Sequence, residues 1–263
     1  MNDHNPIAVI TGASGGIGYE LARVYAQNGY DLLIVARSAD TLQSVAAEIK
    51  AEYGVRVRTI VTDLAMPNSA QKLFETVNQE VDHIDVLINN AGFADHARYA
   101  EEDITTILEM IQLNITTLSQ LTRLVLPGML ARKSGKVLNV ASTAAFLPGP
   151  YMAVYYASKA YVLSFSQALT MELEGTGVYV AALCPGPTAT GFQERAKLHN
   201  AKIFTMLKPM TAREVARSAY RGMQQNKRLI IPGCMNKLTA QVGRFFSRRF
   251  ITKMVRNLQS IEG

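Results

Sequence analysis

The sequence predicts an α/β protein: a doubly wound parallel sheet of about seven strands with helices on both faces. The main observation is a set of seven short apolar runs rich in β-branched residues, at 7–10, 32–35, 55–61, 86–88, 137–140, 178–183 and 229–231. Segments of helical character separate these runs, and this alternation is typical of βαβ units whose sheet is buried on both faces. A glycine-rich turn follows the first run, where a strand is followed by a helix.

Helix boundaries follow from residues that start or end helices. Ser38 and Pro67 are expected starts, whereas Gly29, Gly54 and the pair Gly175 and Gly177 are expected ends. We expect one helix over 19–26 and another over 155–172. No linker or internal repeat interrupts the pattern, so we expect one domain over residues 1–232, including a lid at 187–210, followed by a helical extension at 233–263.

The net charge of +6 is concentrated at the end of the chain. Residues 227–263 carry eight Lys or Arg and one acidic residue, whereas residues 1–226 carry 19 basic and 20 acidic residues. A nucleic-acid-binding body should carry a basic face within the fold, so nucleic acid is not an expected partner. The polar first residues and the lack of a long apolar run indicate a cytoplasmic protein. Cys184 and Cys234 show no metal spacing, and neither a metal nor a disulfide is expected.

The turn at residues 11–18 reads TGASGGIG. Glycine permits a tight turn and lets the backbone approach a ligand, and the start of the following helix presents free N–H groups that favour a phosphate. A turn of small residues without a ligand is the alternative, and the rest of the chain must decide. In a parallel sheet of this kind, ligands bind beyond the carboxyl ends of the strands.

The strings at those carboxyl ends, taken in order, resemble the short-chain dehydrogenase/reductase family over roughly residues 6–232. They are TGASGGIG, NNAG at 89–92, Ser142, the pair Tyr155 and Lys159, and Pro185-Gly186. The resemblance implies a Rossmann-type fold and catalytic residues Asn114, Ser142, Tyr155 and Lys159. It implies a cofactor-binding set of Thr11, Gly12, Ser14, Gly16, Ile17, Gly18, Arg37, Ser38, Asp63, Leu64, Asn90, Ala91, Gly92, Tyr155, Lys159, Pro185, Gly186, Thr188 and Thr190.

The spacing of the catalytic residues suits proton transfer to a carbonyl. Tyr155 and Lys159 lie four apart in a helical stretch, so they share a face. A free tyrosine has a pKa near ~10, and we expect the nearby ammonium to lower it so that Tyr155 acts as general acid or base. Ser142 would donate a hydrogen bond to the substrate oxygen. The resemblance implies that Lys159 also holds the nicotinamide ribose and that Asn114 fixes a water. Tyr156 is expected to pack.

The end of the second strand indicates which nicotinamide cofactor binds. An NAD site usually places an acid there, but this chain has Ala36 followed by Arg37. A guanidinium can pair with a 2′-phosphate, which indicates NADPH. Many NADP-preferring relatives also carry a basic residue in the glycine turn, where this chain has Gly15, so the preference could be moderate. Asp63 resembles the adenine-side position of the family and could also cap the next helix.

The expected substrate wall comes from residues 144–154, Phe93 and the lid. Its expected lining is chiefly apolar: Ala145, Phe146, Leu147, Pro148, Met152, Phe192, Leu198, Phe204, Met206, Leu207 and Met210. A lipophilic ketone, acyl chain or steroid-like ring therefore fits better than a sugar. A 3-oxoacyl reductase and a hydroxysteroid-type dehydrogenase both remain open. A cofactor-binding sensor or scaffold without turnover is the alternative from another class.

The extension mixes apolar and basic residues as an interfacial helix does. Its apolar stripe changes side after Phe246, so we expect two short helices with a break near 247–249. They could cover the substrate cleft, form a subunit contact or contact anionic lipid as a peripheral membrane element, and packing on the protein is favoured. The resemblance also implies a homodimer or homotetramer.

Overall fold

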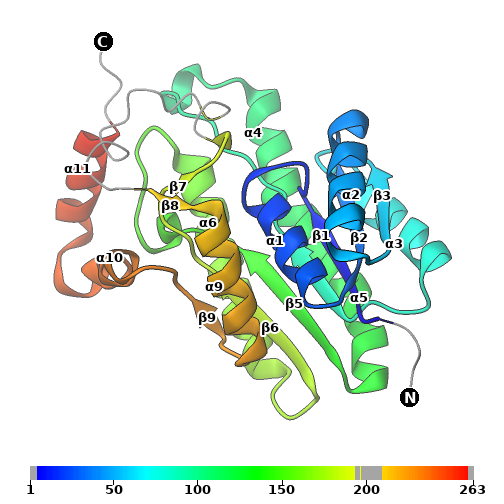
Figure 1. Cartoon of the computed structure of the whole chain (residues 1–263). Coiled ribbons are helices and arrows are strands. Elements are labelled where there is room, and N and C mark those ends of the chain that lie inside the picture. The colour runs from blue at the N-terminus through cyan, green and yellow to red at the C-terminus, as the bar shows by residue number, and fades with distance from the viewer. Residues whose placement is uncertain (1–4, 193–195, 197–208, 260–263) are drawn as a thin grey trace.

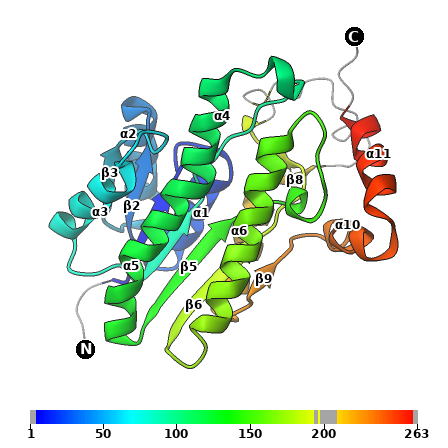
Figure 2. The ribbon, with the colours of Figure 1, turned by 180° about the vertical axis from the view of Figure 1, so that it is seen from behind.

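A seven-stranded parallel sheet with helices on both faces forms the body of the protein (Figures 1 and 2). The structure is a computed structural model, and it describes residues 5–192, 196 and 209–259. The sheet strands are β1 (Ile7–Thr11), β2 (Asp31–Ala36), β3 (Val57–Val61), β4 (Val86–Asn89), β5 (Gly135–Val140), β6 (Val178–Leu183) and β9 (Leu229–Ile230). Their spatial order is β3-β2-β1-β4-β5-β6-β9. All seven predicted strands and the fold class are confirmed.

The helices follow the predicted alternation. They are α1 (Gly16–Gln27), α2 (Ala39–Tyr53), α3 (Ser69–Glu80), α4 (Ile104–Ile111), α5 (Leu118–Arg132), α6 (Ala153–Glu172), α9 (Ala212–Gln224), α10 (Cys234–Phe245) and α11 (Arg248–Leu258), and β7 (Thr188–Ala189) pairs with β8 (Met210–Thr211) outside the main sheet. Short 3₁₀ helices cover Tyr99–Glu101 and Thr143–Phe146, and a π-helical segment covers Gln112–Thr117.

Two predicted helix starts are displaced. The first helix begins at Gly16 rather than at residue 19, because the N–H of Tyr19 already donates to the carbonyl of Gly15. Pro67 does not start α3, since Asn68 precedes the helix with a φ of 61°. Ser38 precedes α2 as expected. The displaced start of α1 places the last glycines of the turn inside the first helical turn.

Two apolar layers hold the helices on the sheet. One packs Leu21, Leu42 and Ala219 of α1, α2 and α9 against strand residues such as Ile10 and Ile34. The other packs side chains of α3, α5 and α6 against the opposite face, which includes Val9 and Leu33. Neighbouring residues of one strand therefore point to opposite layers, as the alternation of side chains along a strand requires. Because the sheet is buried on both faces, a ligand can reach the strands only at their ends.

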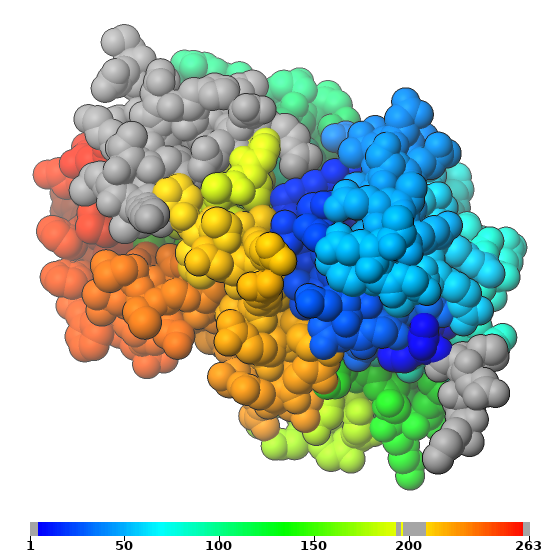
Figure 3. All heavy atoms as spheres, in the orientation of Figure 1, coloured from blue at the N-terminus to red at the C-terminus, as the bar shows by residue number. Residues whose placement is uncertain are grey.

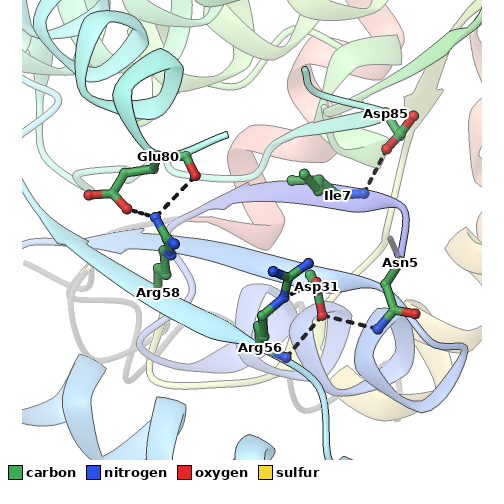
Figure 4. A network of polar contacts seen from close by, with 7 residues as sticks. All are labelled: Asn5, Ile7, Asp31, Arg56, Arg58, Glu80 and Asp85. Atoms are coloured by element: carbon green, nitrogen blue, oxygen red, sulfur yellow. Dashed lines mark hydrogen bonds and ion pairs between the residues drawn. The ribbon is translucent and has the colours of Figure 1, made fainter. Parts of the chain in front are cut away.

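A polar network closes the amino ends of the first strands (Figure 4). Asp31, whose side chain is 7% exposed, accepts hydrogen bonds from the Nε and backbone N–H of Arg56 at 2.6 and 2.9 Å and from Asn5 at 3.2 Å. Asp85 accepts the backbone N–H of Ile7 at 2.7 Å. Arg58 pairs with Glu80 at the end of α3 (Figure 4). These bonds tie β1, β2 and β3 together at the end opposite the ligand-binding edge.

The extension forms two helices, as predicted, with Ser247 as the cap between them. The Ser247 hydroxyl accepts the N–H of Phe250 at 3.3 Å. Ile251 and Val255 of α11 are buried in a cluster with Met152 and Tyr156. The extension therefore packs on the protein, as favoured from the sequence. Among the described residues, no helix has the length and apolar character needed to cross a membrane.

Candidate active site

A cavity of about 600 Å³ lies at the carboxyl ends of the strands. The glycine turn, the ends of β2, β4 and β5, the start of α6 and the segment 185–192 all contribute to its wall. Of the predicted cofactor and catalytic residues, those that line it are Gly12, Ser14, Gly16, Ile17, Gly18, Arg37, Asp63, Leu64, Asn90, Ala91, Gly92, Ser142, Tyr155, Lys159, Pro185, Gly186, Thr188 and Thr190. Thr11, Ser38 and Asn114 do not line it.

The glycine turn is shaped so that larger residues do not fit. Gly12 has a φ of +69°, and a Cβ there would lie 2.8 Å from the amide nitrogen of Asn90. A Cβ on Gly18 would lie 2.2 Å from the carbonyl oxygen of Gly12. The start of α1 therefore packs against the turn, with its free N–H groups at the cavity wall. This combination of close backbone approach and helix start fits the diphosphate of a dinucleotide.

Thr11 and Asn90 hold this turn in place. The Thr11 hydroxyl accepts the backbone N–H groups of Asn90 and Ala91, both at 3.0 Å, and donates to the carbonyl of Ile88 at 3.2 Å. The Asn90 side-chain amide donates to the carbonyls of Thr11 at 2.8 Å and Gly12 at 3.1 Å. Thr11 is 1% exposed, so it positions the turn from behind the cavity wall.

Ser142, Tyr155 and Lys159 meet at the deep end of the cavity. Lys159 lies one turn after Tyr155 on α6, with its Nζ 5.8 Å from the centre of the tyrosine ring. The Lys159 Nζ donates to the carbonyl of Val140 at 2.8 Å, which leaves further N–H donors on the ammonium. The Ser142 hydroxyl accepts the N–H of Ala144 at 3.1 Å. Its own proton has a long contact of 3.5 Å to the Pro185 carbonyl, and the hydroxyl also lies within hydrogen-bond reach of the Tyr155 phenol, so Ser142 and Tyr155 can meet the same substrate oxygen.

Burial controls the proton affinities of these groups. It raises the pKa of Tyr155 to about 12, with a side-chain hydrogen bond to Ser142 acting in the opposite direction. Burial also lowers the pKa of Lys159 to about 8. The expectation that Lys159 lowers the pKa of Tyr155 is wrong for the protein groups alone, because desolvation of the phenolate raises this pKa and outweighs the hydrogen bond to Ser142. At neutral pH the phenol of Tyr155 is therefore protonated and Lys159 is a cation.

Asn114 lies behind the cavity wall, in the π-helical segment between α4 and α5. It is 1% exposed, accepts the N–H of Phe93 at 3.2 Å and donates to the Phe93 carbonyl at 3.0 Å and to the Ser158 hydroxyl at 3.1 Å. A Cβ on Gly92 would meet Asn114 Oδ1 at 2.9 Å and Lys159 Nζ at 3.4 Å. Asn114 therefore fixes the backbone beside Lys159.

The other end of the cavity carries Arg37 and Asp63. The Arg37 guanidinium lies 3.9 Å from the Asp63 carboxylate, and both side chains are largely exposed, at 69% and 40%. Such a long, exposed pair is weak, which leaves the guanidinium able to meet a phosphate. The Asp63 carboxylate also accepts the N–H of Ala65 at 3.0 Å. The Ser38 hydroxyl contacts Thr41 at 2.8 Å and lies outside the cavity wall.

The expected substrate wall is correct only in part. Phe93, Met152 and Phe192 line the cavity, whereas Ala145, Phe146, Leu147, Pro148 and Met210 do not. Ala145 and Phe146 pack against a neighbouring apolar cluster, and Met210 packs against the main core. Leu198, Phe204, Met206 and Leu207, with most of the predicted lid, lie outside the described residues.

Two residues of the wall were not expected. Tyr156 packs, as predicted, but it also lines the cavity, and burial raises the pKa of its phenol. Gln259, directly after α11, donates to the Tyr156 hydroxyl at 2.6 Å, while its backbone carbonyl lies 2.9 Å from the His96 ring nitrogen. Nothing in the local sequence marks Gln259, because only the packing of α11 brings it to the cavity.

The parallel sheet, the glycine turn and the cavity at its carboxyl ends define a Rossmann-type class of dinucleotide-binding protein. The family model for short chain dehydrogenases matches residues 6–201, and the chain belongs to that family. A very-long-chain 3-oxoacyl-CoA reductase of Anas platyrhynchos is 36% identical over 198 residues, covering 72% of this chain and 62% of that protein. The chain spans about 60% of the length of the curated relatives that it matches first.

Solved structures agree over nearly the whole chain. A short-chain dehydrogenase from Sphingobium yanoikuyae in complex with NADPH has 32% identity and a TM-score of 0.82, covering 98% of this chain and 99% of that one. A bulky-bulky ketone specific alcohol dehydrogenase from Comamonas testosteroni has 26% identity and a TM-score of 0.77, with coverage of 98% and 95%.

Proposed function

We propose that this protein is an NADPH-dependent oxidoreductase that reduces the carbonyl group of a lipophilic substrate. The observation that carries the proposal is that Ser142, Tyr155 and Lys159 open into the same cavity as the glycine turn and Arg37. One dinucleotide lying along that cavity would reach from a phosphate-binding end to a proton donor. A sensor or scaffold that only binds the cofactor would not require these three side chains together.

The protein groups suit the reductive direction. The bound nicotinamide cofactor would supply the hydride, and Tyr155 would donate its proton to the carbonyl oxygen as negative charge develops there. A pKa of about 12 keeps the phenol protonated at neutral pH. The Ser142 hydroxyl would donate a second hydrogen bond to the same oxygen. The Lys159 ammonium would bind the nicotinamide ribose and favour the phenolate that the proton transfer leaves.

NADP is the proposed cofactor because Arg37 lies at the end of β2 without a carboxylate at position 36. The guanidinium would pair with the 2′-phosphate, and Gly12, Gly16 and Gly18 would hold the diphosphate. The nearby Asp63 acts against this pairing, which agrees with a moderate preference. The NADPH complex of the Sphingobium yanoikuyae relative supports this choice.

A long-chain 3-oxoacyl thioester is the proposed substrate class. Phe93, Met152 and Phe192 give the inner wall an apolar character, and the curated relatives are named very-long-chain 3-oxoacyl-CoA reductases. A bulky cyclic ketone of the hydroxysteroid type is the competing substrate. The wall residues do not favour a sugar or a small charged acid.

We further propose a cytoplasmic homodimer or homotetramer with no nucleic-acid partner. The exposed apolar residues of α4, Ile104 (62% exposed) and Leu108 (59% exposed), support an oligomer contact on that side. We also propose that the extension at 233–263 makes a peripheral contact with a membrane.

The test is NADPH consumption by the purified protein across a chain-length ladder of 3-oxoacyl thioesters and a set of cyclic ketones. We expect turnover that rises with acyl chain length and is lost in Tyr155→Phe. Preference for cyclic ketones would move the substrate class to hydroxysteroids. Tight NADPH binding without turnover of any carbonyl would overturn the proposal in favour of a sensor.

A further inference from the structure

The outer side of α10 and α11 exposes large apolar side chains. Phe245 is 78% exposed, and Phe246 and Phe250 are 52% and 54% exposed with their rings stacked 5.3 Å apart. Leu238 and Met235 of α10 are each 61% exposed. Leu238 and Phe245 lie seven residues apart, so they share one side of α10. Together these five side chains form what we call the aromatic ridge.

The aromatic ridge lies within a strongly basic segment. Residues 234–258 contain six basic residues and no acidic residue: Lys237, Arg244, Arg248, Arg249, Lys253 and Arg256. All six are exposed, and none forms an ion pair within the part of the chain that the structure describes. Their charges are therefore available to an external anionic partner.

The inner side of α11 is fixed to the body, so this surface is a formed part of the fold. Ile251 and Val255 are 1% and 3% exposed and pack with Met152 and Tyr156. Arg249, Lys253 and Arg256 follow the helical repeat on the opposite side of α11. Figures 1 and 2 place α10 and α11 together at one side of the molecule, away from α2 and α3. In Figure 3 the orange α10 and red α11 form one continuous outer surface.

We propose that the α10–α11 surface docks the protein on an anionic lipid membrane. Phenylalanines that project among lysines and arginines match the boundary between acyl chains and acidic headgroups, where an amphipathic helix lies in the plane of the membrane. The charge argues against a second copy of this chain as the occupant, because a symmetric contact would bring six positive charges against six. The aromatic ridge enters the acyl boundary, and the basic side chains contact the headgroups.

The residue that follows α11 lines the cavity, which gives the docking a consequence. Gln259 follows α11 and lines the cavity, and Val255 packs in the cluster that includes Tyr155. A docked α11 would place the apolar end of the cavity next to the membrane, where lipophilic substrates partition. This consequence rests on the proposed function, whereas the docking itself does not.

The test is sedimentation of the full chain with vesicles, without substrate or cofactor. One set is phosphatidylcholine alone, and the other contains about one third phosphatidylserine. We expect binding to the anionic vesicles that weakens as salt rises and is much weaker with phosphatidylcholine alone. Replacing three arginines (R244Q, R248Q and R249Q) should lower the partition coefficient about a hundredfold, since each basic residue contributes roughly fivefold.

A second variant (F245S, F246S and F250S) should also lose binding, because it removes the aromatic ridge. The matched control is M66S with Y99S, whose exposed apolar side chains (57% and 61%) lie outside α4, α10 and α11 and near acidic rather than basic residues. The control should bind as the wild type does.

Failure of the wild type to bind anionic vesicles at low salt would overturn the proposal. So would equal loss in the control, or a phenylalanine variant that changes an oligomer into monomers by light scattering, which would assign this surface to a second copy. None of these readouts requires turnover, so the docking proposal can fail while the proposed oxidoreductase activity stands.

Discussion

At the amino ends of the strands, the buried carboxylate of Asp31 accepts three hydrogen bonds. At the carboxyl ends, the buried ammonium of Lys159 has one backbone carbonyl, that of Val140, as its hydrogen-bond partner. Both charged groups are about equally hidden, with exposed fractions of 5% for each residue. The amino end of the sheet therefore has a buried charge with three hydrogen-bond donors, whereas the buried charge of α6 at the carboxyl end has a single acceptor among the described residues.

This difference indicates that the amino ends of the strands stabilise the fold, whereas the carboxyl ends hold the candidate reactive groups. The network around Asp31 joins three strands, and none of its residues lines the active-site cavity, so its bonds stabilise the sheet. The carboxyl end instead combines a glycine turn with Tyr155 and Lys159, whose proton affinities are shifted by burial. Shifted titratable groups that line a cavity are typical of functional sites. Substitutions at the two ends should therefore act on different measurable properties.

The largest expected effect is that of Tyr155→Phe on turnover. Loss of the proton donor should lower kcat by about a thousandfold, as is typical for removal of a general acid. The unfolding free energy should change by less than about 1 kcal/mol, since the ring remains and only a hydroxyl is removed. NADPH oxidation and thermal melting of the same samples check both expectations. Retention of more than a tenth of wild-type turnover would remove Tyr155 from the proton-transfer step.

Lys159→Met should separate activity from stability. Turnover should fall by about two orders of magnitude, while the unfolding free energy at pH 7 should rise by roughly 2 kcal/mol. The pKa shift from 10.5 to about 8 corresponds to roughly 3 kcal/mol of unfavourable burial, from which the lost hydrogen bond to Val140 removes about 1 kcal/mol.

The sign of the pH dependence follows from that shift. Below pH 8 the lysine is protonated in both states, so the wild type carries the full cost of the buried cation. Between pH 8 and about 10 the unfolded chain binds more protons than the folded protein, so wild-type stability rises with pH. The advantage of the methionine variant should therefore shrink over that window in denaturant titrations. A methionine variant less stable than the wild type at pH 7 would mean that Lys159 is compensated after all.

The amino end should show the reverse pattern. Asp31→Ala leaves the backbone N–H of Arg56 and the amide of Asn5 without their acceptor, and it should lower the unfolding free energy by about 2 kcal/mol. The exposed guanidinium of Arg56 can return to water, which limits the loss. Saturated turnover at 25 °C should stay within twofold of the wild type. A large loss of kcat in a folded variant would show that the two ends of the sheet are coupled.

The contrast also separates what the sequence could predict from what it could not. The seven strands were predictable because their apolar runs are local and periodic, and the glycine turn, Ser142, Tyr155 and Lys159 form motifs of fixed spacing. The pKa of Tyr155 was not predictable, since its rise depends on how completely the folded chain excludes water. Gln259 was not predictable either, because α11 must first pack on Met152 and Tyr156. Residues that act through tertiary burial leave no local pattern.

The smallest expected effect lies at the exposed mouth of the cavity. Arg37→Ala should weaken NADPH binding by about tenfold, at the lower end for a charged phosphate contact, because the side chain is 69% exposed and Asp63 lies 3.9 Å away. Adding Ala36→Asp should reverse the preference toward NADH, since a carboxylate at that place repels a 2′-phosphate and can bind a ribose hydroxyl. Michaelis constants for the two cofactors provide the measurement.

Arg58→Ala is the matched control, because it removes an arginine from β3 that pairs with Glu80 in the amino-end network. If that control changed the NADPH constant as much as Arg37→Ala does, general surface charge rather than a specific contact would determine cofactor choice.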